Sequence, residues 1–202
     1  GIDSGRGLIV LGDTIARADF AGLLAAPGHA MGVKAVADPR RFGVAVVEGG
    51  RIDHGHHAGN AHRALTDTIE LSNAVRVALA KTDPKTTLIV VTADHSHTFT
   101  ISGYPKRGNP ILGLVVGSSG ESPLGTTPAP DLTGLPYTTL GYANGPGYVG
   151  ASDAQPEGPK RLPHFAKRYR APKLGRPDLA DVDTESSLYL QEATLPLASE
   201  TH

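Results

Sequence analysis

One stretch of the sequence, residues 42–57, most constrains what this chain can fold into. It reads F-G-V-A-V-V-E-G-G-R-I-D-H-G-H-H, an apolar run followed by a carboxylate, two glycines, an aspartate and three histidines. The continuous β-branched run predicts a strand buried on both faces, as in a parallel sheet. A second apolar run, residues 87–93, leads into Asp94, His95 and His97. Two strands that each end in acidic and imidazole side chains predict a metal site.

A helix is predicted between these strands, over residues 60–81. Asn60 can cap its first turn, and Asp83-Pro84 ends it. Its apolar face is expected at helical spacing on Leu65, Ile69, Ser72, Val75 and Leu79, widened by Ala64, Leu71, Ala74 and Ala78. Strand, helix and strand in succession predict a right-handed βαβ unit, so both acidic strand ends should lie at one edge of the sheet. We therefore expect an α/β fold with a mostly parallel sheet flanked by helices.

The segments outside this unit give weaker signals. Residues 8–11 predict a short strand, residues 13–24 a helix, and residues 111–116 a third strand. Residues 117–159 are dense in Gly, Pro, Thr and Ser, which predicts a long, ordered surface insertion. Residues 160–176 hold seven Lys or Arg, and we interpret them as a solvated surface rather than an anion-binding patch.

Composition excludes several classes of protein and of site. A net charge of -1 gives no general attraction to nucleic acid or to an anionic membrane. No apolar run approaches the length of a membrane span, and the first residues show neither a basic region nor an apolar core typical of a signal peptide. The absence of Cys excludes thiolate ligands, so a transition-metal site here must use His and carboxylate.

The spacing of the acidic and imidazole residues suits divalent metal ions. Asp53 and His57 are four residues apart, so one helical turn would place both on one face. Glu48, at the strand end, could hold a second ion. Asp94 and His95 are adjacent and share an ion only if the turn after their strand curls them together. Such donors favour Zn²⁺ at imidazole-rich positions and Mg²⁺ at an all-oxygen position, although H-G-H-H alone could be a surface histidine patch.

The strings V-E-G-G-R-I-D-H-G-H-H-A-G-N-A, at 47–61, and V-T-A-D-H-S-H, at 91–97, resemble the alkaline phosphatase family. The resemblance continues through A-L-T-D-T-I-E-L-S-N-A-V, G-Y-A-N-G-P-G-Y and the closing S-E-T-H, and covers residues 42–202. It implies a phosphomonoesterase with two Zn²⁺ and one Mg²⁺, acting on a phosphomonoester to release inorganic phosphate. It also implies a homodimer located in the periplasm or outside the cell.

The resemblance assigns roles to individual residues. Six of them match metal ligands of the family: Asp53, His57 and His202 for the first zinc, Asp94 and His95 for the second, and Glu48 for magnesium. His97 matches a residue that orients a ligand carboxylate, and His54 matches a position beside the first zinc that contacts phosphate directly or through water. His56 and His62 match no ligand, and we expect them to be structural or exposed, as we do His29.

No residue of this sequence matches the nucleophilic Ser of the family, which opens a helix in a D-S-A-type turn. Asp3-Ser4-Gly5 is only a superficial echo, and Arg51 does not match the family's phosphate-clamping Arg. We therefore assign no catalytic residue within this chain.

The expected organisation is one partial domain in four parts. Residues 1–41 match the family poorly, residues 42–116 form the core with the metal ligands, residues 117–176 are rich in loops, and residues 177–202 end at a ligand. Two alternatives to a phosphomonoesterase remain open. One is a non-catalytic fragment that binds zinc or phosphate, and the other is a phosphodiesterase of the same superfamily.

Overall fold

The computed structural model describes residues 6–12, 32–38, 42–117, 125–131, 134–148 and 176–202. The chain divides into two compact units. Unit 1 comprises Gly1–His54 and Arg63–Ser96, and unit 2 comprises Gly55–His62 and His97–His202. The helix predicted at 13–24, Ser4, His29 and the basic segment before Arg176 lie outside the described residues.

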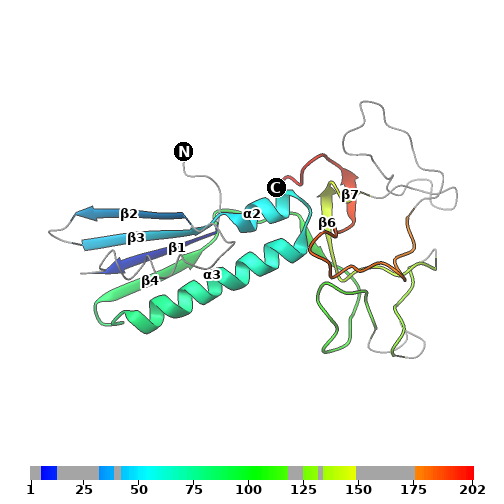
Figure 1. Ribbon diagram of the computed structural model, residues 1–202, viewed down its shortest axis with the longest axis horizontal. Helices are drawn as coiled ribbons and strands as arrows, with labels where there is room; N and C mark the ends of the chain where they lie inside the picture. The colour runs from blue at the N-terminus through cyan, green and yellow to red at the C-terminus, as the bar shows by residue number, and fades with distance from the viewer. Residues whose placement is uncertain (1–5, 13–31, 39–41, 118–124, 132–133, 149–175) are drawn as a thin grey trace. The chain divides into compact units, whose positions relative to one another are not determined.

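Unit 1 is built on a four-stranded sheet with the order β2-β3-β1-β4. Its strands are β1 (Arg6–Gly12), β2 (Gly32–Asp38), β3 (Phe42–Gly49) and β4 (Thr87–Thr92), and Figure 1 shows them side by side. The strands predicted at 8–11, in 42–57 and at 87–93 are thus confirmed. The prediction of a mostly parallel sheet is wrong, because every hydrogen-bonded pair in this sheet is antiparallel. Strand β1 lies between β3 and β4 and runs opposite to both, and β2 runs opposite to β3.

The C-terminal ends of β3 and β4, which lead into the acidic residues, nevertheless lie side by side at the same end of this sheet. Gly7 of β1 pairs with Glu48 of β3 on one side and with Thr92 of β4 on the other. Since β3 and β4 are both antiparallel to β1, they run in the same direction, as the βαβ reading predicts. The segments that follow the two strands therefore start from the same level of the sheet.

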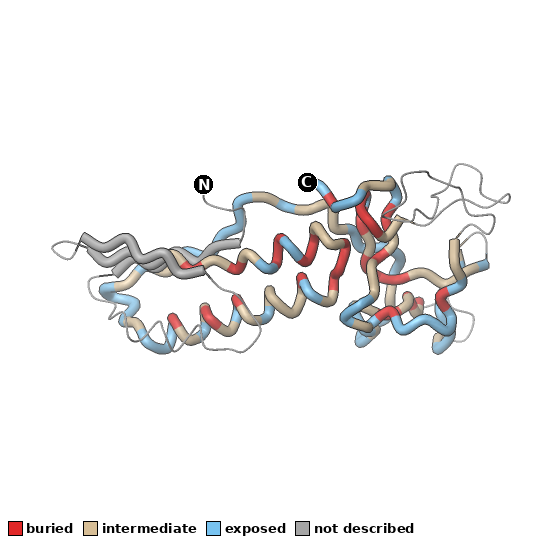
Figure 2. Tube along the Cα trace, turned by 45° about the horizontal axis from the view of Figure 1, so that its top comes forward, coloured by how far each residue is buried: buried red, intermediate tan, exposed pale blue. Residues whose placement is uncertain are grey.

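Two helices follow β3, and the longer one confirms the predicted bounds. Helix α2 covers Arg51–His57 and helix α3 covers Ala61–Lys81. Two residues predicted on the buried face of α3 are exposed instead: Ile69 is 59% exposed and Leu79 is 61% exposed. The residues predicted to widen this face are buried, and Figure 2 shows buried positions recurring along the helix. They are Ala64, Leu71, Ala74 and Ala78. Three of these four are alanines, whose small side chains let neighbouring backbone approach the helix closely.

The edge strand β4 exposes apolar side chains on both of its faces. Leu88 is 58% exposed and Val91 is 54% exposed, and the odd spacing between them places them on opposite faces. By contrast, Val47 of β3 is fully buried. None of the helices in the described ranges is both long and apolar enough to cross a membrane.

Unit 2 contains a three-stranded sheet with the order β5-β6-β7. Strand β6 (Leu140–Gly145) pairs antiparallel with β5 (Phe99–Ile101) and parallel with β7 (Ala193–Pro196). The reading of 117–159 as a surface insertion is wrong for β6, the central strand, where Leu140 and Tyr142 are each 2% exposed. The strand predicted at 111–116 is also wrong, since this segment forms an isolated bridge from Leu114 to Thr138.

Candidate metal centre

Unit 2 gathers three imidazoles and one carboxylate from segments far apart in the sequence. The four residues are His57, His97, Glu200 and His202, and one ligand atom of each lies within 4.8 Å of the others. His57 ends α2, His97 precedes β5, and Glu200 and His202 follow β7. The predicted ligands His57 and His202 are therefore brought together, and His97 lies beside them.

The Glu200 carboxylate is the buried centre of this cluster. It has no exposed surface, and it accepts hydrogen bonds from His97 Nδ1 at 2.7 Å, from the Thr98 backbone N–H at 2.8 Å and from the Thr98 hydroxyl at 2.8 Å. Burial alone would raise the pKa of Glu200, but the hydrogen bonds from Thr98 and His97 outweigh it and hold the pKa below its usual value. The cluster thus contains a carboxylate that is ionised at neutral pH.

The histidines of the cluster are held in orientations that suit metal binding. His57 Nδ1 lies 2.5 Å from the backbone carbonyl oxygen of Glu200, so Nδ1 carries the proton and donates, and Nε2 keeps its lone pair. The His202 ring lies 5.5 Å from the His57 ring and 5.2 Å from the His97 ring, between centroids. Imidazole and carboxylate donors without thiolate fit Zn²⁺, which binds them at about 2.0–2.2 Å.

Unit 1 brings together the other predicted zinc ligands. His95 Nε2 lies 3.7 Å from Asp53 Oδ1 and 3.6 Å from Asp94 Oδ2. After β4, the His95 backbone N–H also donates to Asp94 Oδ1, at 3.1 Å. The turn therefore curls Asp94 and His95 together, which is the condition for both to share one ion. Asp53, from α2, is 5% exposed and adds a second carboxylate.

The remaining predicted residues are more scattered. Glu48 lies on β3, and its Oε1 is 3.4 Å from the place that a Cβ on Gly50 would take, so the carboxylate folds back over this glycine. His54 is exposed on α2, and His62 is half-buried at the start of α3. His56, expected to be structural or exposed, is buried at 2% exposure.

Sequence reasoning missed Glu200 as a member of the cluster. Its only signal is its place in S-E-T-H, two residues before the predicted ligand His202. Its burial and its hydrogen bonds with residues 97 and 98 depend on contacts more than a hundred positions apart, which no local pattern reveals.

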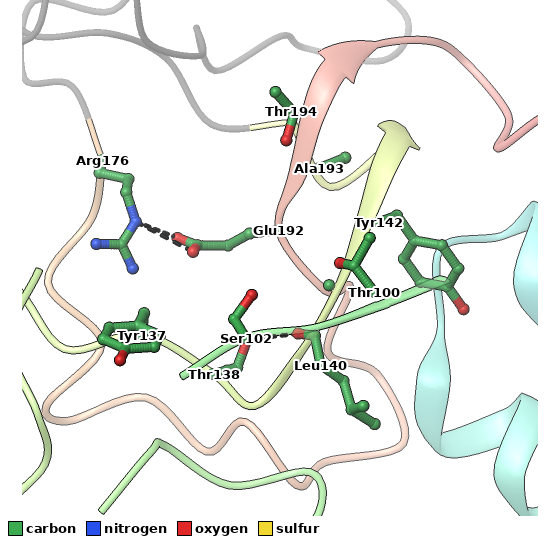
Figure 3. A pocket seen from close by; sticks show the side chains of 11 residues that line it. Thr100, Ser102, Tyr137, Thr138, Leu140, Tyr142, Arg176, Glu192, Ala193 and Thr194 are labelled. Carbon is green, nitrogen blue, oxygen red and sulfur yellow. Dashed lines mark hydrogen bonds and ion pairs between the residues drawn. The ribbon is translucent and has the colours of Figure 1, made fainter. Parts of the chain in front are cut away.

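A cavity of about 230 Å³ in unit 2 is lined by residues of β5, β6 and β7 and by Arg176 (Figure 3). Arg176 lines it and donates from Nε to both Glu192 oxygens, at 2.9 and 3.0 Å, and from Nη1 to Asp131 at 2.5 Å. Its Nη2 donates to the Pro136 carbonyl at 2.7 Å. The two carboxylates thus offset the charge of the guanidinium. Arg176 therefore connects Asp131, Pro136 and Glu192 within unit 2, and its charge is already paired rather than available to an anion.

Comparisons with known proteins identify the family of this chain. The profile of the alkaline phosphatase family matches residues 37–202. The chain is 41% identical over 167 residues to a tissue-nonspecific alkaline phosphatase of Gallus gallus, 38% over 157 residues to an alkaline phosphatase of Gadus morhua, and 37% over 175 residues to alkaline phosphatase 4 of Drosophila melanogaster. These matches cover 82%, 78% and 86% of this chain and 25%, 26% and 26% of the relatives. The chain therefore spans about a quarter of the length of these relatives, and it belongs to the alkaline phosphatase family.

Proposed function

We propose that the protein containing these residues hydrolyses phosphate monoesters at a centre that binds two Zn²⁺ and one Mg²⁺. The observation that carries the proposal is the buried Glu200 carboxylate among three histidines, in a chain that belongs to the alkaline phosphatase family. Three hydrogen bonds, from His97 and Thr98, already offset the burial of this charge. A bound divalent cation would supply the opposite charge.

The proposed ligands follow the family resemblance and the two clusters. His57 and His202 bind the first zinc, and the resemblance adds Asp53, one helical turn before His57 on α2. Asp94 and His95 bind the second zinc, and Glu48 binds magnesium. When bound, such ions polarise the phosphate ester and lower the pKa of coordinated water.

The neighbouring residues hold these ligands in place. Glu200 fixes the His97 ring through the hydrogen bond to Nδ1, and its backbone carbonyl fixes the tautomer of His57. The hydrogen bond from the His95 N–H to Asp94 keeps that pair curled at the end of β4. His54 is exposed on α2, and we assign to it contact with the substrate phosphate, directly or through water.

The same proposal includes the setting of the protein. Because the chain spans about a quarter of its relatives, hydrolysis, release of inorganic phosphate, a homodimer, and a location in the periplasm or outside the cell are proposed for the protein that carries these residues. No catalytic nucleophile is assigned to this chain.

The test is hydrolysis of p-nitrophenyl phosphate by the purified protein, with and without EDTA, compared with hydrolysis of bis(p-nitrophenyl) phosphate. We expect metal-dependent turnover of the monoester, a strong preference over the diester, and a loss of at least about 10–100-fold in His202→Ala. The control His62→Ala, which removes an imidazole that matches no ligand, should retain activity. Zinc binding without turnover would replace the proposal with a non-catalytic zinc protein, and a preference for the diester would replace it with a phosphodiesterase.

A further inference from the structure

Two side chains of β6 reach toward the metal cluster of unit 2 without belonging to it. Tyr142 and Asn144 are two residues apart on this strand, so they lie on the same face of the sheet. Tyr142 is 2% exposed and Asn144 is 9% exposed. In Figure 3 the Tyr142 ring points away from the cavity that Arg176 lines. Neither residue has a role in the proposed chemistry.

Tyr142 is connected to the cluster through His56. Its hydroxyl oxygen lies 2.8 Å from His56 Nδ1, and the His56 ring stacks on the His97 ring with 4.4 Å between centroids and 23° between planes. His97 in turn bonds the Glu200 carboxylate. A change in the rotation of His56 about its side-chain bonds would therefore move a ring that lies flat against a member of the cluster.

Asn144 is connected to the other side of the cluster through Thr201. Its Nδ2 donates to the Thr201 carbonyl at 2.8 Å, and its Oδ1 accepts from the Thr201 backbone N–H at 2.8 Å. These two bonds engage both the backbone N–H and the backbone carbonyl of Thr201. Thr201 lies between Glu200 and His202, so Asn144 fixes the backbone that carries two members of the cluster.

We propose that Tyr142 and Asn144 are positioning residues of the metal centre: Tyr142 sets the plane of the His97 ring through His56, and Asn144 sets the backbone that presents Glu200 and His202. This inference rests on the proposed metal binding of the unit 2 cluster. It accounts for the burial of His56, which matches no ligand. Packing alone does not call for the Tyr142 hydroxyl, since the ring also contacts Phe99 at 5.0 Å between centroids, a contact that Phe at this position would keep.

The variants Tyr142→Phe and Asn144→Asp test this inference with little change in shape. The first removes one hydroxyl and keeps the ring, and the second removes the donor to the Thr201 carbonyl and keeps an acceptor. Tyr104→Phe is the matched control, because it removes a hydroxyl from a side chain that is 76% exposed. His202→Ala identifies which metal signal belongs to this cluster.

The measurements on the purified protein are Zn²⁺ affinity, by competition with a chromogenic chelator, and the visible absorption of the Co²⁺-substituted protein, which reports ligand geometry. We expect Tyr142→Phe and Asn144→Asp each to weaken the affinity about 10–100-fold and to shift the Co²⁺ bands that His202→Ala abolishes. Tyr104→Phe should change neither.

The outcomes separate this inference from the proposed function. If wild-type protein binds metal at the cluster while both variants keep its affinity and its Co²⁺ spectrum, the positioning role is wrong and the metal centre stands. A lower melting temperature with an unchanged Co²⁺ spectrum would likewise reduce both residues to ordinary core residues. If wild-type protein shows no Co²⁺ or Zn²⁺ signal that His202→Ala removes, the metal centre itself fails.

Discussion

At the scale of single residues, burial sets the chemistry of two tyrosines in unit 2. Burial is the largest cause that raises the pKa of Tyr142 and of Tyr189 well above the ordinary 10.0, and the nearby charges of Glu200 and Glu192, respectively, raise it further. Both phenols therefore stay protonated at alkaline pH, where exposed tyrosines begin to ionise. This keeps the Tyr142 hydroxyl able to pair with His56.

The first prediction concerns the ionisation of these tyrosines. In a pH titration followed by tyrosinate absorbance, we expect Tyr142 and Tyr189 to ionise well above pH 10.0, and Tyr142→Phe to remove one of these two late steps. Because the unfolded state loses these protons near pH 10.0 and the folded state does not, the free energy of unfolding should fall above that pH, by about 1.4 kcal/mol per pH unit for each tyrosine. A titration in which Tyr142→Phe removes no late-ionising group would contradict this prediction.

Gly147 shows how one residue can be required by its surroundings. A Cβ at this position would overlap the backbone carbonyl of Gln191, whose own backbone N–H donates to the Gly59 carbonyl at 2.9 Å. The close approach involves backbone on both sides, so no side-chain rotation relieves it. Gly147 belongs to the G-Y-A-N-G-P-G-Y string that carries part of the family resemblance.

The second prediction is that Gly147→Ala destabilises the protein by about 1–3 kcal/mol or more, because the backbone must shift to admit the methyl group. Urea denaturation measures this change. Gly108→Ala is the control, since a Cβ there meets nothing within 4 Å and costs only the strain of a φ of +83°. A smaller effect at residue 147 than at residue 108 would show that the approach is not as tight as the structure indicates.

At the scale of elements, Arg176 joins segments that have little regular structure. It bonds Asp131, the Pro136 carbonyl and Glu192, which immediately precedes β7. Burial would lower the pKa of Arg176, but its bonds to Glu192 and Asp131 outweigh this and raise the pKa, so the charge is permanent. Burial raises the pKa of Glu192, and Arg176 opposes that rise.

The third prediction is that Arg176→Gln destabilises the protein by roughly 3 kcal/mol, because it leaves two partly buried carboxylates without their cation. Arg176→Lys should fall between this variant and wild type, since an ammonium keeps the charge but cannot donate in parallel to both Glu192 oxygens. Denaturant unfolding at neutral pH gives both values. Equal stability of wild type and Arg176→Gln would mean that solvent screens the network.

The elements also show which parts of the fold could be predicted. The strands near 8–11, 42–49 and 87–92 and helix α3 follow from local apolar patterns, which depend on neighbouring residues only. The insertion of β1 between β3 and β4 could not be predicted, because sheet order depends on non-local pairing. Strand β6 was hidden by its glycine-rich composition, although its alternate residues Leu140, Tyr142 and Asn144 are buried.

At the scale of the whole molecule, five of the six predicted ligands lie in clusters, one cluster in each unit. Asp53, Asp94 and His95 meet in unit 1, and their adjacency in the sequence or at strand ends made them predictable. His57 and His202 meet in unit 2, and only the resemblance to a family could pair residues so far apart. Glu200 escaped prediction because its role depends on burial, which sequence spacing does not report.

The fourth prediction, and the most direct test of the central claim, is the zinc content of purified wild-type protein and of two variants, measured by atomic emission after dialysis. We expect about two zinc ions in wild type, and loss of one ion in Asp94→Ala with the other retained. In His202→Ala we expect loss of the other ion. His62→Ala should keep the wild-type content. Equal loss of both ions in Asp94→Ala, or a wild-type protein without zinc, would contradict the assignment of two separate zinc sites.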